Sequence, residues 1–472
     1  MEVTGEGPFS MLWQFAADSE QLRIYSSDAT IESWLRVEAA LATAQAEAGV
    51  IERSDAEAIG RAAVLDNIDR DELWKSARNV GYPIFGLVRQ ISAHLPEGPN
   101  GRVHYGATTQ DIMDSGLALQ MTASLEALDA QIQRLGDLLA AQAAKYRNTV
   151  MPGRTHGQQA VPTTFGATIA GVLDELRRQR ERLVNAHESV QAVSLFGAGG
   201  TNAAEGPKSI QVRARVAELL GLRDADVPWH VNRDRLSEYG FVCATICGTL
   251  AKLARDVVDL SRTELAEVFE PFNPHRGASS TMPQKVNPIS SELIIGISAM
   301  ASSMLSVFTR IQEAGHQRSA GEWQAEWLAV PTMGTLAGSA LNEAIVIAQG
   351  MRVDTERMRQ NLRLDGGLIM AEAQMIQLAE HLGREHAHDL VYAASTRARE
   401  QHQVLAEALR AVAAEQGKAD LLPDHLVEAA DYTGEAGYIV DRAVELWHGS
   451  ASANSGSAAG NGSVIPADPV RN

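Results

Sequence analysis

Residues 121–139 read MTASLEALDAQIQRLGDLL, and their apolar side chains recur at alternating intervals of four and three positions. The positions in this repeat are Met121, Leu125, Leu128, Ile132, Leu135 and Leu139. That spacing aligns the side chains along one side of an α-helix, which is typical of helices that pack lengthwise against other helices. The stretch therefore predicts a long helix inside a bundle and, with it, an all-α fold.

Two more stretches carry the same repeat. Their members are Ile246, Leu250, Leu253, Val257 and Leu260 in the first, and Leu293, Ile297, Met300, Met304 and Val307 in the second. Residues 165–190 are expected to form a further long helix. The composition agrees, because only 5% of the residues are aromatic and β-rich chains favour aromatic and β-branched residues.

The helical segments fall into three groups along the chain. We predict a central long-helix bundle domain at 111–360, between an N-terminal helical domain at 1–110 and a C-terminal helical domain at 361–448. The last segment, 449–472, is rich in Ser, Gly, Ala and Asn. It offers too little apolar surface to fold, so we predict a disordered tail.

The charge and the hydropathy pattern narrow the class of protein. A formal net charge of -18 argues against nucleic acid as a partner, since an acidic surface repels phosphate. The N-terminal residues MEVTGEGPFS lack the basic and apolar regions of a secretory signal, and no apolar run approaches the ~20 residues that cross a bilayer. We therefore predict a cytoplasmic protein with no membrane partner.

Neither a metal nor a cofactor is predicted. Cys243 and Cys247 lie four positions apart in a helical pattern, which favours two small buried residues over a metal-binding pair. The histidines do not pair with carboxylates at metal-ligand spacing. Residues 197–202 read GAGGTN, but they lack the third glycine and the strand context of a dinucleotide-binding loop. A glycine-permitted turn between helices is expected there.

Segments rich in Gly, Pro and Thr interrupt the predicted helices at 101–111, 149–164, 197–208 and 271–290. In an all-helical protein such breaks can carry the chemistry, because loops present reactive groups while rigid helices hold them in place.

The segment 277–288, GASSTMPQKVNP, contains two hydroxyls, a cation and an amide. A serine hydroxyl is a poor base at its ordinary pKa, and it acts as one only when nearby cations and oriented N–H groups stabilise its alkoxide. Lys285 and the loop's own amide N–H groups are the candidates for that stabilisation.

This segment closely resembles the signature G-S-S-x-M-P-x-K-x-N of the fumarase/aspartase superfamily, with Ala278 before the serine pair as the departure. The resemblance implies a fold of helical domains around a central long-helix bundle and no cofactor. It assigns the catalytic base to Ser279. It assigns substrate binding to Lys285 and Asn287, and we add Ser280 as a further substrate-binding residue.

The segment 153–162, GRTHGQQAVP, resembles the T-H-x-Q element of the same superfamily. The resemblance places His156 on the acid or charge-relay side of the catalytic site. It also implies that Thr155 and Gln159 bind substrate.

The segment 104–111, HYGATTQD, resembles the first element of the superfamily, whose hydroxyls bind a substrate carboxylate. The candidate substrate-binding residues are Thr108, Thr109 and Gln110. Asp111 is expected to cap the helix that follows, since Asp is favoured at helix starts.

Residues 232–235, NRDR, resemble an arginine-bearing element of the adenylosuccinate lyase and carboxymuconate branches. Arg233 or Arg235 is expected to face an anion, and Arg233 is predicted to bind substrate. The alternative is a surface ion pair, which is what most arginines form.

The resemblance runs from about residue 12 to residue 448 and implies a homotetramer that acts on a small dicarboxylate-type substrate. Each active site would combine loops from three different subunits. The heptad spacing agrees indirectly, because long apolar stripes require partner helices.

Several segments look most like 3-carboxy-cis,cis-muconate cycloisomerase, among them GEWQAEW at 321–327. Adenylosuccinate lyase fits less well, because Asn79 stands where that branch carries a histidine. Retention of His156 favours anti elimination from an amino- or nitrosuccinate with release of fumarate. We therefore predict a lyase, with the lactone-forming cycloisomerase as the alternative. A non-catalytic structural member fits poorly with the intact set of Ser279, Lys285 and Asn287.

Overall fold

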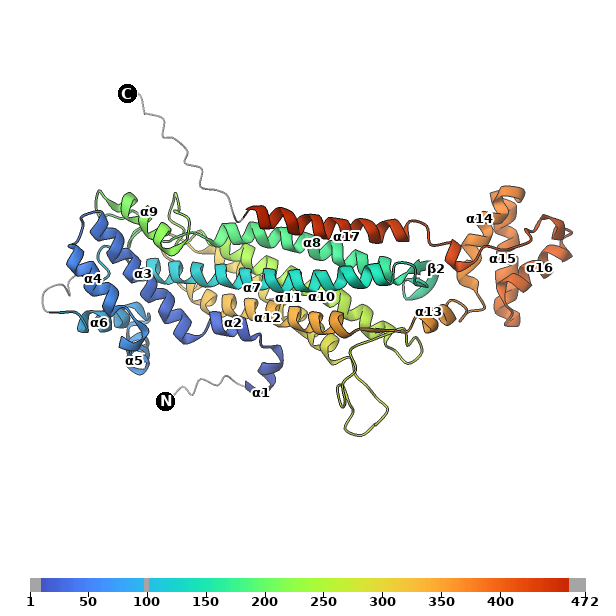
Figure 1. Cartoon of the computed structure of the whole chain (residues 1–472), viewed down its shortest axis with the longest axis horizontal. Helices are drawn as coiled ribbons and strands as arrows, with labels where there is room; N and C mark the ends of the chain where they lie inside the picture. The colour runs from blue at the N-terminus through green and yellow to red at the C-terminus, as the bar shows by residue number, and fades with distance from the viewer. Residues whose placement is uncertain (1–9, 97–101, 458–472) are drawn as a thin grey trace, which may run out of the picture. The chain divides into compact units, whose positions relative to one another are not determined.

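The computed structural model describes residues 10–96 and 102–457 and confirms the all-α fold (Figure 1). The long helices are α3 (Ser27–Glu47), α7 (Thr109–Lys145), α8 (Phe165–Val190), α10 (Asp234–Leu260), α11 (Ile289–Arg310), α12 (Glu322–Gly350) and α17 (Ala436–Ser457). The shorter helices are α1 (Ser10–Trp13), α2 (Ser19–Ile24), α4 (Arg53–Ala62), α5 (Arg70–Val80), α6 (Ile84–Ala93), α9 (Ser209–Leu220), α13 (Thr355–Asn361), α14 (Ala371–Leu382), α15 (Arg384–Gln401) and α16 (Leu405–Glu415).

Short 3-10 helices and strands complete the described chain. The 3-10 helices are η1 (Gln14–Ala16), η2 (Leu65–Asn67), η4 (Ile311–Glu313), η5 (Leu368–Met370), η6 (Ala419–Leu421) and η7 (Ala429–Asp431). The strands form two antiparallel pairs, β1 (Val150–Thr155) with β2 (Gln158–Thr164) and β3 (Val268–Phe269) with β4 (Arg352–Val353).

The chain divides into two compact units. The first comprises Met1–Ile132, Gln179–Ala251 and Leu293–Glu343, and the second comprises Gln133–Arg178, Lys252–Glu292 and Ala344–Asn472. The predicted domain boundaries at residues 110 and 360 remain predictions. Helix α17 extends to Ser457, into the segment predicted to be a disordered tail, and the rest of that segment lies outside the described residues.

The apolar stripes of α7 and α10 are buried, as the heptad spacing predicted. Every member of the α7 stripe has an exposed fraction of 0%, and the members of the α10 stripe are at most 8% exposed. Cys243 and Cys247 of α10 are free and fully buried, which confirms the prediction for both.

Polar contacts align the long helices within the first unit. Arg180 of α8 pairs with Asp129 of α7 at 2.7 Å. Gln131 of α7 donates to the side chain of Asn342 in α12 at 2.8 Å. These contacts fix the lengthwise register of helices whose apolar stripes alone would allow sliding.

Helix α11 differs from α7 and α10. Ile297 in its stripe is buried, but Met300 is 55% exposed and Leu293, Met304 and Val307 are only half-buried. By length and composition, Ile289–Glu313 could cross a membrane, with a mean hydropathy of 1.5 and only 28% of its most apolar window buried. The prediction that no apolar run approaches this length was therefore wrong. Ser, Gly and Ala residues interrupt the run in the sequence without making the helix polar.

In the second unit, α17 packs on α7 through the indole of Trp447. This side chain is fully buried, and its Nε1–H donates to Asp137 Oδ1 at 2.8 Å. The contact requires Gly136, because a Cβ atom there would lie 1.9 Å from the indole ring.

A Gly136→Ala substitution should displace Trp447 and lower the free energy of unfolding by about 1–3 kcal/mol, the usual cost of overpacking. Equilibrium denaturation followed by tryptophan fluorescence measures the effect. Gly60→Ala is the matched control, since Gly60 lies in α4 with open space at its Cβ position. Alanine should stabilise that helix by up to about 1 kcal/mol. Equal effects of the two substitutions would contradict the packing described for α17.

Candidate functional site

The T-H-x-Q segment forms the tip of the β1–β2 hairpin in the second unit. Thr155 pairs with Gln158, and the two residues between them, His156 and Gly157, have φ angles of 52° and 75°. Two successive positive φ angles are typical of a type I′ turn, which suits the twist of a hairpin. The side chains of Thr155 and His156 are exposed at the tip. The structure therefore presents the predicted acid residue outward, on a rigid two-stranded support.

A buried carboxylate anchors this hairpin. Glu267, whose side chain is 0% exposed, accepts two hydrogen bonds from Arg154 of β1 at 2.6 and 2.9 Å. The side-chain amide of Asn361 in α13 also donates to Glu267 at 2.7 Å. The backbone carbonyl oxygen of Asn361 accepts from Gln159 Nε2 at 2.8 Å. Gln159 thus uses an amide N–H to hold the hairpin, and its predicted contact with substrate stays a prediction.

The signature segment forms a loop whose two sides are joined. Ala278 and Val286 form an isolated β-bridge, and the N–H of Asn287 donates to Gly277 O at 2.8 Å. Between these residues the loop is largely exposed, and the side chains of Ser280 and Lys285 are exposed. Lys285 forms no ion pair with any carboxylate among residues 10–96 and 102–457.

Ser279 lies at the start of the exposed part of this loop. Its Oγ accepts hydrogen bonds from the backbone N–H groups of Thr281 and Met282, at 3.3 and 3.1 Å. Donors that point at an oxygen stabilise negative charge on it. Contacts to the N–H groups two and three positions along the chain are also those of an ordinary serine turn, and the role of Ser279 as the base stays a prediction.

Glu270 anchors both ends of the signature loop. Its buried carboxylate accepts from Ser290 N at 3.2 Å and from Ser291 N and Oγ at 2.7 and 2.8 Å, at the start of α11. It also pairs with Arg276, which precedes the signature, at 3.1 Å. A carboxylate at a helix N-terminus satisfies N–H groups that lack partners inside the helix.

Asp111 holds the segment before α7 in the first unit. Its fully buried carboxylate accepts from the N–H of Thr108 at 3.0 Å, but Asp111 does so as the third residue of α7 and does not precede the helix as predicted. It also accepts from the N–H groups of Phe196 and Gly197, both at 2.9 Å, and lies 2.8 Å from His230 Nε2. Residues 197–202 therefore form a turn on Asp111, as expected from their glycines.

Arg233 is buried rather than open to a ligand. Its side chain is 1% exposed, and it pairs with Asp114 of α7 and Glu326 of α12, which are equally buried. One further N–H donates to the carbonyl oxygen of Trp229. The anions that Arg233 faces are therefore carboxylates of the protein itself. The prediction that Arg233 binds substrate was wrong, because its guanidinium is buried and already paired. Arg235 donates to the carbonyl oxygen of Ser189 instead of facing an anion.

Thr108 and Gln110 meet an arginine that the sequence analysis missed. Arg318, between η4 and α12, donates from Nε to Gln110 Oε1 at 2.9 Å and from a terminal nitrogen to Thr108 Oγ1 at 3.4 Å. Residue 318 follows a stretch without helical periodicity and matches none of the motifs. Spacing gave no signal for it.

The predicted residues therefore occur in three groups. Thr108, Thr109 and Gln110 lie at the start of α7, Thr155 and His156 lie at the hairpin tip, and Ser279, Ser280, Lys285 and Asn287 lie on the signature loop. Among the described residues, no hydrogen bond or ion pair joins the side chain of Ser279 or Lys285 to His156.

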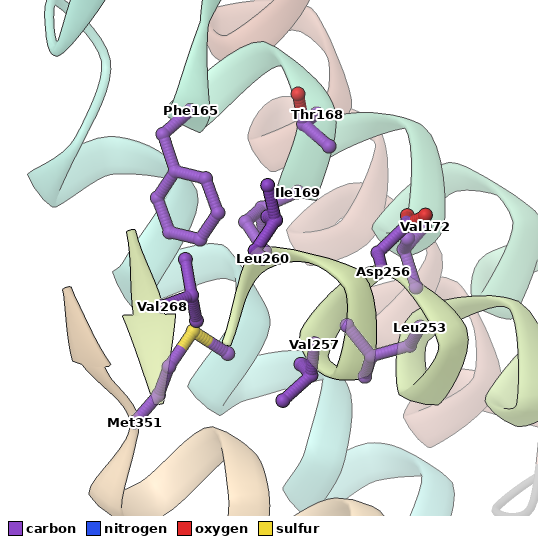
Figure 2. A pocket seen from close by; sticks show the side chains of 10 residues that line it. All are labelled: Phe165, Thr168, Ile169, Val172, Leu253, Asp256, Val257, Leu260, Val268 and Met351. Carbon is purple, nitrogen blue, oxygen red and sulfur yellow. The ribbon is translucent and has the colours of Figure 1, made fainter. Parts of the chain in front are cut away.

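An apolar cavity in the second unit contains none of the predicted site residues. Figure 2 shows it between residues of α8 and α10, with Val268 and Met351 at one side. It is almost entirely apolar and holds about one water molecule. A polar hollow in the first unit, lined by Arg182, Arg223 and their neighbours, also contains none of the predicted site residues. In the described part of the chain, no group of three or more His, Cys, Asp and Glu side chains is arranged to hold a metal ion.

Comparisons with known proteins identify the class to which this fold and these loops belong. A family model described as "Lyase" matches residues 6–302, and one described as "Adenylosuccinate lyase C-terminus" matches residues 367–443. The chain therefore belongs to the fumarase/aspartase superfamily and is an enzyme of that superfamily. These matches confirm the resemblance predicted from the sequence.

Three relatives show which enzymes of the superfamily this chain resembles. A 3-carboxy-cis,cis-muconate cycloisomerase of Pseudomonas aeruginosa is 41% identical over 433 residues, covering 90% of this chain and 94% of the relative. The crystal structure of the 3-carboxy-cis,cis-muconate lactonizing enzyme of Pseudomonas putida superposes with a TM-score of 0.87 at 38% identity, covering 93% of this chain and 99% of that one. An N-acetyl-S-(2-succino)cysteine lyase of Dickeya dadantii is 33% identical, covering 91% of this chain and 95% of the relative.

Burial of Glu326 makes stability depend on pH. Desolvation, opposed by the attraction of Arg233, raises the pKa of Glu326 from 4.5 to about 7. The folded state then binds a proton that the unfolded state releases, so the free energy of unfolding falls as pH rises from about 4.5 to about 7.

Between about pH 5 and pH 8, the wild type should lose roughly 3 kcal/mol relative to Glu326→Gln, which keeps a hydrogen-bond acceptor for Arg233 but does not titrate. Urea denaturation across this pH range measures both curves. Parallel curves for the two proteins would show that Glu326 keeps an ordinary pKa.

Proposed function

We propose that this enzyme is a cycloisomerase that forms a lactone from a carboxylated muconate of the 3-carboxy-cis,cis-muconate type. The proposal is supported by the signature loop, where Ser279 Oγ accepts hydrogen bonds from two backbone N–H groups. It is also supported by the 41% identity of the chain to a 3-carboxy-cis,cis-muconate cycloisomerase. Retention of His156 favoured fumarate-releasing elimination as the first prediction. The relatives favour the alternative, so the order is reversed here.

The two reactions share their chemistry. In lactone formation, a carboxylate oxygen of the substrate bonds to one carbon of a double bond. The electron pair of that double bond moves toward the other carbon, which lies next to a second carboxylate and takes up a proton. In elimination the same steps run backwards, so the proton leaves from the carbon next to the carboxylate and the group on the neighbouring carbon departs. Both directions pass through a carboxylate that carries extra negative charge.

The signature loop is suited to that intermediate. Lys285, the lone cation of the loop, and the amide of Asn287 would hold the carboxylate on which negative charge develops. Stabilisation of that charge would supply the larger share of the rate gain. Ser279 would exchange the proton at the adjacent carbon. Its two backbone donors stabilise the serine alkoxide when the proton is absent. Ser280 would bind the same carboxylate.

The remaining groups would bind and orient substrate. Thr108, Thr109 and Gln110 are proposed to contact a second carboxylate through hydroxyl and amide groups. Thr155 would bind substrate at the hairpin tip. His156, exposed beside it, would supply or accept the proton of the other reacting group, directly or through a water molecule.

Elimination from a succinyl compound with release of fumarate is the second candidate. The observation in its favour is His156, which the hairpin presents outward for proton transfer to a leaving group. One relative is a lyase of N-acetyl-S-(2-succino)cysteine, whose leaving atom is sulfur rather than the nitrogen first predicted.

We also propose a cytoplasmic homotetramer with shared active sites. The apolar side of α11 supports it, because an apolar stripe with Met300 55% exposed is a costly surface for a lone chain in water. The exposed hairpin tip and signature loop also leave room for groups from other subunits.

Ser279→Ala should lower turnover by about 10²–10⁴-fold with unchanged helicity, because the base is lost and the fold is not. The assay follows loss of the conjugated diene of 3-carboxy-cis,cis-muconate by ultraviolet absorbance, with lactone identified by NMR. Thr281→Ser keeps the backbone donor to Ser279 and is the matched control. Conversion by Ser279→Ala at the wild-type rate would refute the base. No lactone, together with fumarate from N-acetyl-S-(2-succino)cysteine, would select the second candidate.

Met300→Glu should dissociate the tetramer, since a carboxylate would be buried without a partner at the proposed interface. Sedimentation velocity measures the assembly, and turnover should fall with it because sites would lose groups from neighbouring subunits. Ile210→Glu is the control, a 69% exposed apolar residue on α9. An intact tetramer in Met300→Glu, or a wild-type monomer with full activity, would contradict the proposal.

A further inference from the structure

Glu205 is a buried carboxyl group that no cation of the described chain neutralises. The residue is 6% exposed and follows the turn at residues 197–202. Its Oε2 accepts a hydrogen bond from Gln45 Nε2 of α3 at 2.8 Å. Its Oε1 is shielded from solvent and accepts no hydrogen bond from residues 10–96 and 102–457. An ionised carboxylate with one neutral donor would be costly in this position.

The charged side chains around Glu205 do not offset that cost. Lys208, three positions further on, donates to two backbone carbonyl oxygens at the end of α3. His104 pairs with Glu38 at 2.7 Å. Asp111 adds a second negative charge nearby. The surroundings therefore favour the neutral form of Glu205.

The amide of Gln45 has an oxygen that lacks a donor. Both N–H groups of its Nε2 are used, one by Glu205 Oε2 and one by the carbonyl oxygen of Tyr105 at 2.7 Å. Gln45 is 0% exposed, and no described residue donates to its Oε1. Two orphaned acceptors thus belong to two groups that one hydrogen bond already joins. One proton on Glu205 would satisfy both, because an amide and a carboxylic acid can pair through two hydrogen bonds.

This amide–acid pair lies against the first substrate-binding element. Gly106 has a φ angle of 77°, and a Cβ atom there would clash with Glu205 Oε2, so the backbone at Gly106 lies directly on the carboxyl group. At the other end of the element, Asp111 accepts from the N–H of Thr108. The short segment between these two contacts carries the hydroxyl groups predicted to bind substrate.

The pKa of Glu205 agrees with the geometry. Burial raises it above the ordinary value of a glutamate. The hydrogen bond from Gln45 opposes this shift, and the negative charge of Asp111 reinforces it.

We propose that Glu205 is a positioning residue, which keeps its proton in the active enzyme and donates it to Gln45 in a hydrogen bond. This neutral pair holds the segment 104–110 in the position that binds substrate. The inference rests on the proposed function, in which hydroxyl and amide groups of this segment contact a carboxylate. An ionised Glu205 would instead set its Oε1 against Gln45 Oε1 and loosen the segment.

The infrared spectrum of the full-length enzyme at neutral pH tests the proton directly. The difference between the wild type and Glu205→Gln should contain the C=O stretching band of a neutral carboxyl group, which an ionised carboxylate lacks. Glu218→Gln is the matched control, because the side chain of Glu218 is 67% exposed and its removal should delete no such band. A Glu205→Gln difference without the band would overturn the proposal.

The Michaelis constant for 3-carboxy-cis,cis-muconate tests the positioning. Glu205→Gln supplies an amide N–H in place of the acid proton, so it should stay within about twofold of the wild type. Glu205→Leu fills the space without hydrogen bonds and should raise the Michaelis constant about tenfold, with kcat changed less than about threefold. Gln45→Met serves if Glu205→Leu does not fold. Equal losses in Glu205→Gln and Glu205→Leu would show that the charge is needed and would overturn the proposal.

Hydrogen exchange separates this inference from the proposed reaction. Amides of the segment 104–110 should exchange at the wild-type rate in Glu205→Gln and about tenfold faster in Glu205→Leu. That result in an enzyme that forms no lactone would keep the positioning role and reject the cycloisomerase. Lactone formation together with equal exchange in all three proteins would keep the reaction and reject the positioning role.

Discussion

Buried carboxylates that each accept several donors hold the non-helical segments of this protein to its helices. Asp111 fixes the segment before α7, Glu267 fixes the β1–β2 hairpin, and Glu270 fixes the signature loop. Burial of an ionised group is unfavourable unless its oxygens are fully satisfied. Each anchoring carboxylate therefore favours the loop conformation that satisfies its oxygens, while the side chains of His156, Ser280 and Lys285 remain exposed.

The ion pair of Arg233 extends this principle to the helices of the first unit. One guanidinium contacts Asp114 of α7 and Glu326 of α12 from the residue that precedes α10. Two acids share one base, so the cluster is an unfavourable way to stabilise a core. Its effect is specificity of position, because Asp114 also orients Gln110.

The sequence predicted the long helices and the signature loop, but it did not predict which helix faces would be buried. Heptad spacing gave α7 and α10 because their stripes are buried within the chain, where periodicity and burial coincide. The same spacing in α11 predicted a helix but not that Met300 would remain exposed, since a stripe does not specify whether its partner belongs to the same chain. The motif around Ser279 located the signature loop because its residues are contiguous.

Roles that depend on distant contacts were beyond sequence reasoning. Arg233 sits in a motif, and its charge suggested a ligand, but its partners lie on α7 and α12, more than 90 positions away in sequence. Arg318 became recognisable only through its contacts with Thr108 and Gln110. Gln159 has the spacing of the T-H-x-Q element, yet its amide N–H is used by Asn361.

The central claim is that a serine on an exposed loop moves a proton at the carbon next to a substrate carboxylate. Conversion of 3-carboxy-cis,cis-muconate in D₂O, with NMR analysis of the lactone, tests it most directly. The account predicts one non-exchanging deuterium, on a single face of the carbon beside the carboxylate. A lactone without deuterium at that carbon, or with deuterium on both faces, would contradict it.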